Sequence, residues 1–66
     1  MPRNARQWAR RELDRAAGLC DNIGVHLDRI ESVYRPVRPH IADATIGIMT
    51  LLRECQSLMT EMRKLL

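Results

Sequence analysis

The chain has 66 residues, with 11 Lys and Arg side chains against 8 Asp and Glu, and a formal net charge of +3. A chain of this length buries little surface alone, so small domains usually depend on disulfides, a metal ion or a second subunit. Its two cysteines cannot form a dense disulfide framework, and neither lies in a CxxC pair, which argues against a zinc site. We therefore expect the chain to need a partner.

The amino-acid usage is typical of a helical protein that stays in water. Phe is absent, and Leu, Ile, Ala and Met supply most of the apolar side chains, as they do in helices. No apolar run approaches the ~18 residues that a membrane-spanning helix needs. The charged N-terminus is not followed by the apolar stretch of a secretory signal. We expect a cytoplasmic protein (in the host cytoplasm if it is phage-encoded) that has no membrane partner.

A first helix is predicted over about residues 4–34, with Asn4 as its N-cap. Apolar side chains recur along it at alternating spacings of four and three residues, the heptad pattern of a helix packed against another helix. The residues of this first seam are Ala9, Leu13, Ala16, Cys20, Ile23, Leu27, Ile30 and Tyr34. Gly18 and Gly24 each weaken the helix by about 1 kcal/mol relative to Ala, so tertiary contacts must hold it.

A Pro-containing turn over 35–39 leads into a second helix over about residues 39–65. Pro36 disfavours the helical conformation at the residue before it, and Pro39 suits the first turn of the next helix. The second helix has its own heptad seam. Its residues are Ile41, Ala44, Ile48, Leu51, Cys55, Leu58, Met62 and Leu65. Because the turn is short and the helices match in length, we expect one antiparallel hairpin domain over residues 1–66.

The two seams can be paired from end to end. Facing residues in an antiparallel pair have position numbers that add to a nearly constant value, and this holds from Tyr34 opposite Ile41 down to the chain ends. Cys20 then faces Cys55, either as two packed free thiols or as a disulfide. The sequence thus predicts an all-α fold, an antiparallel helical hairpin (αα-hairpin), whose two seams contact each other.

A further set of small or apolar side chains lies beside the seam, where a two-helix hairpin has no third layer to cover it. We expect this ledge to contact a second copy, which would complete a homodimeric four-helix bundle, or another protein. Its residues are Ala17, Gly24, Thr45, Met49, Leu52, Met59 and Leu66. The alternative is a set of scattered surface side chains without a partner.

Basic side chains are concentrated toward both chain ends, which a hairpin brings to one pole. The predicted basic pole consists of Arg3, Arg6, Trp8, Arg10 and Arg63. Trp8 offers a ring on which a nucleic-acid base could stack, yet acidic residues intersperse and the net charge is modest. A protein partner is therefore favoured over nucleic acid, and a purely solvated face is the third possibility.

No catalytic or metal-binding pattern is recognisable. No nucleophile is accompanied by a positioned base, and His26 and His40 have no further ligands to complete a metal site, so we expect neither an enzyme nor a cofactor. The expected function is a protein–protein interaction module, an adaptor or antagonist of a larger regulatory protein or motor. Phages and mobile elements encode small helical inhibitors of host proteins, and this chain is compatible with one. An RNA- or DNA-binding bundle and a structural assembly piece are the alternatives.

Overall fold

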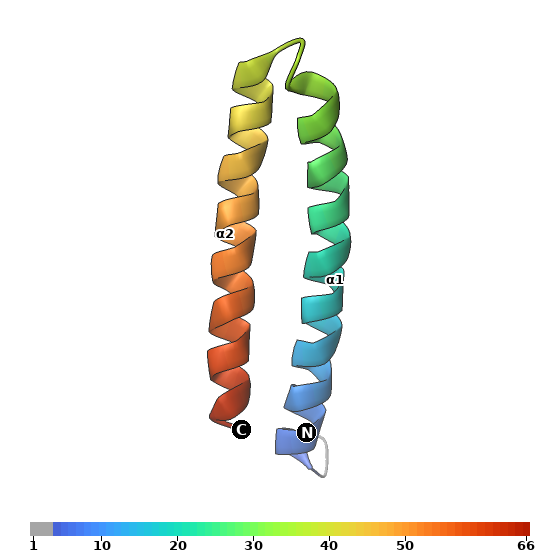
Figure 1. The fold of residues 1–66 in the computed structure, drawn as a ribbon. Helices are drawn as coiled ribbons and strands as arrows, with labels where there is room; N and C mark the ends of the chain where they lie inside the picture. The colour runs from blue at the N-terminus through green and yellow to red at the C-terminus, as the bar shows by residue number, and fades with distance from the viewer. Residues whose placement is uncertain (1–3) are drawn as a thin grey trace.

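The computed structural model describes residues 4–66, and this range is all-helical apart from the turn and the ends. Helix α1 spans Ala5–Tyr34 and helix α2 spans Pro39–Lys64. The two helices pack against each other and run antiparallel, so that the start of α1 and the end of α2 lie at the same end (Figure 1). The hairpin measures 53 × 16 × 14 Å. The predicted all-α hairpin is confirmed.

The open end of the hairpin carries the first turn of α1 and the last turn of α2. Asn4 caps α1, since its side-chain oxygen accepts a hydrogen bond from the backbone N–H of Gln7 at 3.0 Å. Arg63 and Lys64 stand in the last turn of α2, where positive charge interacts favourably with the negative end of the helix dipole. The Asn4 cap was predicted from the sequence.

The closed end is a turn over residues 35–38. The backbone N–H of Arg35 still donates to the carbonyl oxygen of Glu31 at 2.9 Å. Pro36 follows it and has no N–H with which to continue the helix. Pro39 occupies the first turn of α2. The N–H groups there have no partner within the helix, so the lack of an N–H in proline costs no hydrogen bond. This short connection brings the two helices together as neighbours.

The contact between the helices uses a different row of α2 from the one that the sequence predicted. Most of the predicted row points outward: Leu51 is 63% exposed and Leu58 is 69% exposed. The row that contacts α1 lies one residue further along the chain at each step. Its members are Ala42, Thr45, Met49, Leu52, Gln56 and Met59. The predicted pairing of the two seams is therefore wrong by one residue on α2. On α1, Ile23 and Ile30 of the predicted seam are exposed as well, and the neighbouring Gly24 and Glu31 are half-buried instead.

Two neighbouring rows of α2 follow the same three–four spacing, which is why periodicity alone cannot choose between them. The row that packs inward contains small side chains near the closed end, and Ala42 there is 0% exposed. Further along, Leu52 lies against Gly24, where an added Cβ would be 3.9 Å from Leu52 Cδ2. Gly24 thus lets a large side chain of α2 approach the backbone of α1.

The same shift separates the two cysteines. Cys20 is half-buried at the contact, whereas Cys55 is exposed, and both are free thiols. Gln56, and not the predicted Cys55, lies opposite Cys20, since Gln56 and Cys20 line the same groove. The predicted Cys20–Cys55 layer is not formed.

Two glycines on the outside of the helices provide a test of the helix energetics. A Cβ added to Gly18 or Gly47 would meet nothing within 4 Å. Gly18→Ala and Gly47→Ala are each expected to raise the free energy of unfolding by about 1 kcal/mol, because Gly costs more backbone entropy in a helix than Ala. Chemical denaturation followed by circular dichroism measures this. A loss of stability at either position would show that another group packs there.

Candidate interaction surfaces

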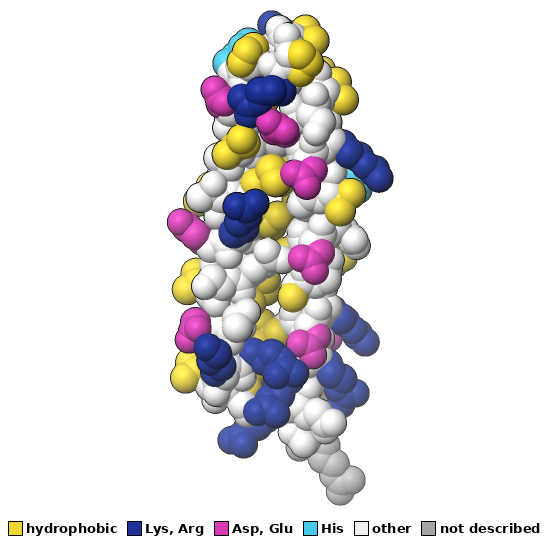
Figure 2. Space-filling view, viewed as in Figure 1, with side chains coloured by type: hydrophobic (Ala, Val, Ile, Leu, Met, Phe, Trp, Pro, Cys, Tyr) yellow, Lys and Arg dark blue, Asp and Glu magenta, His cyan; other side chains and the backbone are white. Residues whose placement is uncertain are grey.

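One face of the hairpin is polar and is crossed by bonds between the helices. On α1 its acidic side chains stand one position after the inward-pointing residues, as Asp21 follows Cys20. The Gln56 side chain donates to Asp21 at 2.9 Å, and Arg63 Nε donates to Asp14 Oδ1 at 2.9 Å. Figure 2 shows this face, with acidic side chains following α1. These bonds hold the register of the two helices along this face.

At the closed end a single arginine joins both helices. Arg35 Nη1 donates to Asp43 Oδ1 at 2.7 Å, and its Nε donates to Glu31 Oε1 at 2.8 Å. The hydrogen bond with Asp43, and to a smaller extent the one with Glu31, raises the pKa of the Arg35 guanidinium above its usual value. The side chain is therefore committed to the hairpin and is not available as a partner-binding group.

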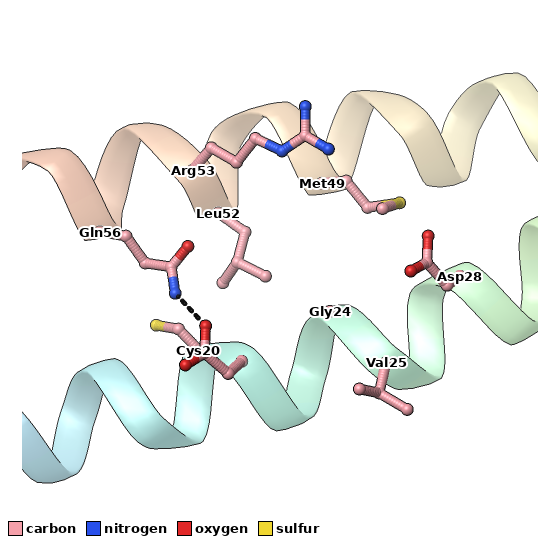
Figure 3. Close-up of a pocket in the computed structure, with 9 residues that line it drawn as sticks. Cys20, Gly24, Val25, Asp28, Met49, Leu52, Arg53 and Gln56 are labelled. Atoms are coloured by element: carbon pink, nitrogen blue, oxygen red, sulfur yellow. Dashed lines mark hydrogen bonds between the residues drawn. The ribbon is translucent and has the colours of Figure 1, made fainter.

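A shallow groove runs between the helices on the polar face (Figure 3). Leu52 points into it toward Gly24, while the Arg53 side chain is directed away from α1. The acidic groups that line it are Asp21, which accepts the bond from Gln56, and Asp28. The groove thus combines apolar side chains, among them Leu52, Met49 and Val25, with carboxylates that do not converge on a common point, and it offers no enclosed site for a small molecule.

The predicted ledge lies at the contact between the two helices of one chain. Its side chains are half-buried, and Thr45 is buried with its hydroxyl donating to the carbonyl oxygen of Ile41 at 2.9 Å. These residues are Ala17, Gly24, Thr45, Met49, Leu52, Met59 and Leu66. The reason is the one-residue shift on α2, which turns this row toward α1. They are not an uncovered ledge, and their contact with a second chain stays a prediction.

The row of α2 that the heptad spacing predicts at the helix contact is instead largely exposed and forms part of a large outward surface. Each of its residues directly precedes an inward-pointing residue, as Leu51 precedes Leu52. Successive helical residues are 100° apart, so in an antiparallel pair the preceding residues of both helices share one side, opposite the polar face. We call this side the outer apolar face. It consists of Leu19, Ile23, Ile30, Ile48, Leu51, Cys55, Leu58 and Met62, all exposed.

The continuity of the outer apolar face distinguishes it from scattered surface residues. On α2 the row from Ile41 to Leu65 contains only uncharged side chains. On α1, Ile23 and Ile30 continue it across the hairpin, each more than two-fifths exposed. On α1 the corresponding positions also include Glu12 and His26, so the uninterrupted part is the row on α2. An uninterrupted apolar row of this length is unusual for a monomer and typical of an interface.

The basic pole is formed only in part. Arg3 lies outside the described residues. Arg6, Trp8 and Arg10 are exposed at the start of α1, and Lys and Arg side chains gather at this end in Figure 2. Arg63 is bound to Asp14. Within residues 4–66 neither Arg6 nor Arg10 has a carboxylate at salt-bridge distance, so these two arginines are the ones that remain available.

Neither described helix is both long and apolar enough to cross a membrane. In the part of the chain that the structure describes, no three His, Cys, Asp or Glu side chains are grouped as metal ligands, and His26 and His40 are both exposed. The chain matches no family model, no curated protein and no solved structure. Its function must be inferred from the surfaces themselves.

Proposed function

We propose that this chain is a protein–protein interaction module that pairs with itself through the outer apolar face and presents its basic poles to a larger acidic protein. The single observation that carries the proposal is the outer apolar face. Two copies joined there form a homodimeric four-helix bundle, the arrangement in which each helix of a hairpin gains a second neighbour. The role is that of an adaptor or antagonist, and no chemistry is required of it.

The exposed area of the chain supports a second copy as the occupant. A folded monomer of 7.7 kDa is expected to expose about 4,300 Å². The hairpin exposes 5343 Å², about 1,000 Å² more than this scaling. Each partner in a standard interface buries about 800 Å², and a face 53 Å long and 16 Å wide supplies about that area. The excess is thus enough to cover the area that one partner of a standard dimer buries.

The lack of an internal core supports the same conclusion. Within residues 4–66, Ala42 and Thr45 are the buried residues, and no large side chain is fully buried. The radius of gyration is 15.6 Å, against about 11 Å for a compact chain of this length. A hairpin with so little internal packing gains its stability from association. Sedimentation at micromolar concentration is expected to report twice the chain mass, with a melting temperature that rises with concentration.

An acidic protein surface is the partner that suits the basic pole. The open end has six basic residues against three acidic ones among the described residues of 4–15 and 61–66. Three of the six, Arg15, Arg63 and Lys64, form ion pairs with Glu12, Asp14 and Glu61. The remaining charge is too small and too interrupted for the row of phosphate contacts that nucleic acid requires. Exposed arginines beside an aromatic ring are typical of protein interfaces.

The variant Arg6→Glu, Arg10→Glu tests the basic pole. It is expected to preserve helicity and dimer mass, because acidic groups near a helix N-terminus favour its dipole. It is expected to weaken partner binding by about tenfold or more, through like-charge contact with an acidic surface. Binding is measured against the protein partner identified by crosslinking and mass spectrometry.

Arg29→Glu is the matched control, because Arg29 is exposed on α1 away from the pole. It reverses a charge without changing the proposed contact and is expected to bind as the wild type does. Unchanged binding of the double variant would show that the pole is a solvated face. If nuclease abolishes the complex, the partner is RNA or DNA and the protein-partner proposal fails.

A further inference from the structure

We infer that the two hairpins of the dimer pack antiparallel, about a two-fold axis perpendicular to the helices that passes between Ile23 and Leu51, so that the two basic poles lie at opposite ends. The inference rests on the proposed dimer through the outer apolar face. It adds how the copies are arranged, and therefore where the partner-binding ends are.

Two symmetric arrangements place one outer apolar face on another. With the axis along the helices, both open ends lie together and α1 of one chain covers α2 of its partner. With the axis across the helices, the open ends lie apart, α1 covers α1 and α2 covers α2. In both arrangements every helix has antiparallel neighbours, so the helix dipoles do not choose between them. Side-chain charge and packing complementarity must therefore decide between the two arrangements.

The charge distribution favours the second arrangement. The described part of the open end has six basic and three acidic residues, whereas residues 16–60 have four basic and five acidic ones. With the axis along the helices, two positive ends would lie within one bundle width of each other. With the axis across them, the basic residues of the two ends are separated by about 40 Å on average, far beyond the Debye length of about 8 Å at physiological salt.

The side chains of α2 are complementary to themselves about the transverse axis. Gly24 and Leu52 lie against each other near the middle of α2, and the proposed axis passes at this level. Counting along the helix at ~1.5 Å per residue, Leu51 then meets the same residue of the partner subunit. Ile48 faces Cys55 of the partner subunit, and Ala44 faces Leu58 of the partner subunit. Away from the axis, larger side chains are thus set opposite smaller ones, which favours close packing of the bundle.

The same axis gives the one acidic residue at the edge of this surface a polar neighbour. Glu12 of α1 then lies at the level of Tyr34 of the partner subunit, whose hydroxyl can donate to the carboxylate. With the axis along the helices, Glu12 would instead face the apolar end of the partner's α2. Glu12 already pairs with Arg15 of its own helix at 3.4 Å. The transverse axis adds a second polar neighbour, whereas the other arrangement would surround this ion pair with apolar side chains, which is less favourable.

The consequence is a bivalent module. Each end of the bundle presents one set of exposed arginines, Arg6 and Arg10, and the two sets lie about 40–50 Å apart. Such a molecule binds two acidic surfaces at once, one at each end, and does not concentrate its charge on one site. Where both surfaces belong to one assembly, the second contact is intramolecular and strengthens binding without any new interaction.

Spin-label distances test the arrangement. Arg38 lies in the turn at the closed end, is exposed and forms no side-chain cap of α2, so Arg38→Cys carries a label without touching the outer apolar face. The native thiols are replaced by Cys20→Ala and Cys55→Ala. Labels in the dimer are expected about 40 Å apart, against about 25 Å or less if the closed ends lie together. Arg11→Cys, at the open end, is expected to give a similarly long distance.

Sedimentation of the same labelled samples separates the two levels of the proposal. A dimer with long distances at both positions supports the antiparallel arrangement. A dimer with short distances at both positions overturns it and leaves the proposed dimer standing. A folded, labelled chain that stays monomeric, as does the unlabelled wild type, overturns the dimer and the arrangement together.

Discussion

Leu51→Glu is expected to abolish pairing of the chain, weakening the dimer by about 100-fold or more. Leu51 is 63% exposed in the single hairpin and stands in the middle of the outer apolar face. In the antiparallel dimer the substitution places two carboxylates at the two-fold axis, in an apolar contact with no basic group to pair them. Because the hairpin has little core, the separated chain is also expected to lose helicity on dilution.

The matched control is Ser57→Glu, which adds the same side chain at an exposed position of α2 outside the outer apolar face. It is expected to leave the sedimentation coefficient unchanged. Analytical ultracentrifugation across a concentration series measures both variants. If Leu51→Glu pairs as tightly as the wild type, the outer apolar face is not the dimer contact, and the proposed function loses the observation that carries it.

Ala42→Leu is expected to lower the free energy of unfolding by about 1–3 kcal/mol, because a larger side chain must displace closely packed neighbours. Ala42 is 0% exposed and lies near the closed end, where the short turn prevents the helices from separating. The effect tests the register of the hairpin itself, since the pairing predicted from periodicity would leave Ala42 off the seam.

Ser57→Leu provides the comparison, since it adds a leucine to an exposed position of the same helix. Surface changes of this kind are usually within about 0.5 kcal/mol of neutral. Urea unfolding of the wild type and both variants at one chain concentration measures the difference. Equal stability of Ala42→Leu and the wild type would mean that Ala42 is not packed against α1, and the one-residue shift on α2 would then be wrong.

The helices and the turn could be predicted because their signals are local. Asn4 accepts the bond that an N-cap makes, and Pro36 and Pro39 act through their own rings on the adjoining backbone. The heptad spacing likewise predicts that each helix has a partner. None of these inferences requires knowledge of which residues meet. The availability of Arg6 and Arg10 followed in the same way from their place near the chain end.

The choice between two apolar rows on α2 could not be predicted from spacing, because both rows repeat alike. It depends on which row fits α1 in space: Gly24 makes room for Leu52, and Gln56 bonds to Asp21 across the helices. One step of 100° around α2 turned the predicted ledge inward and the predicted seam outward. The same packing removed Arg63 from the available part of the basic pole, since it brought Asp14 of the other helix within 2.9 Å of its guanidinium.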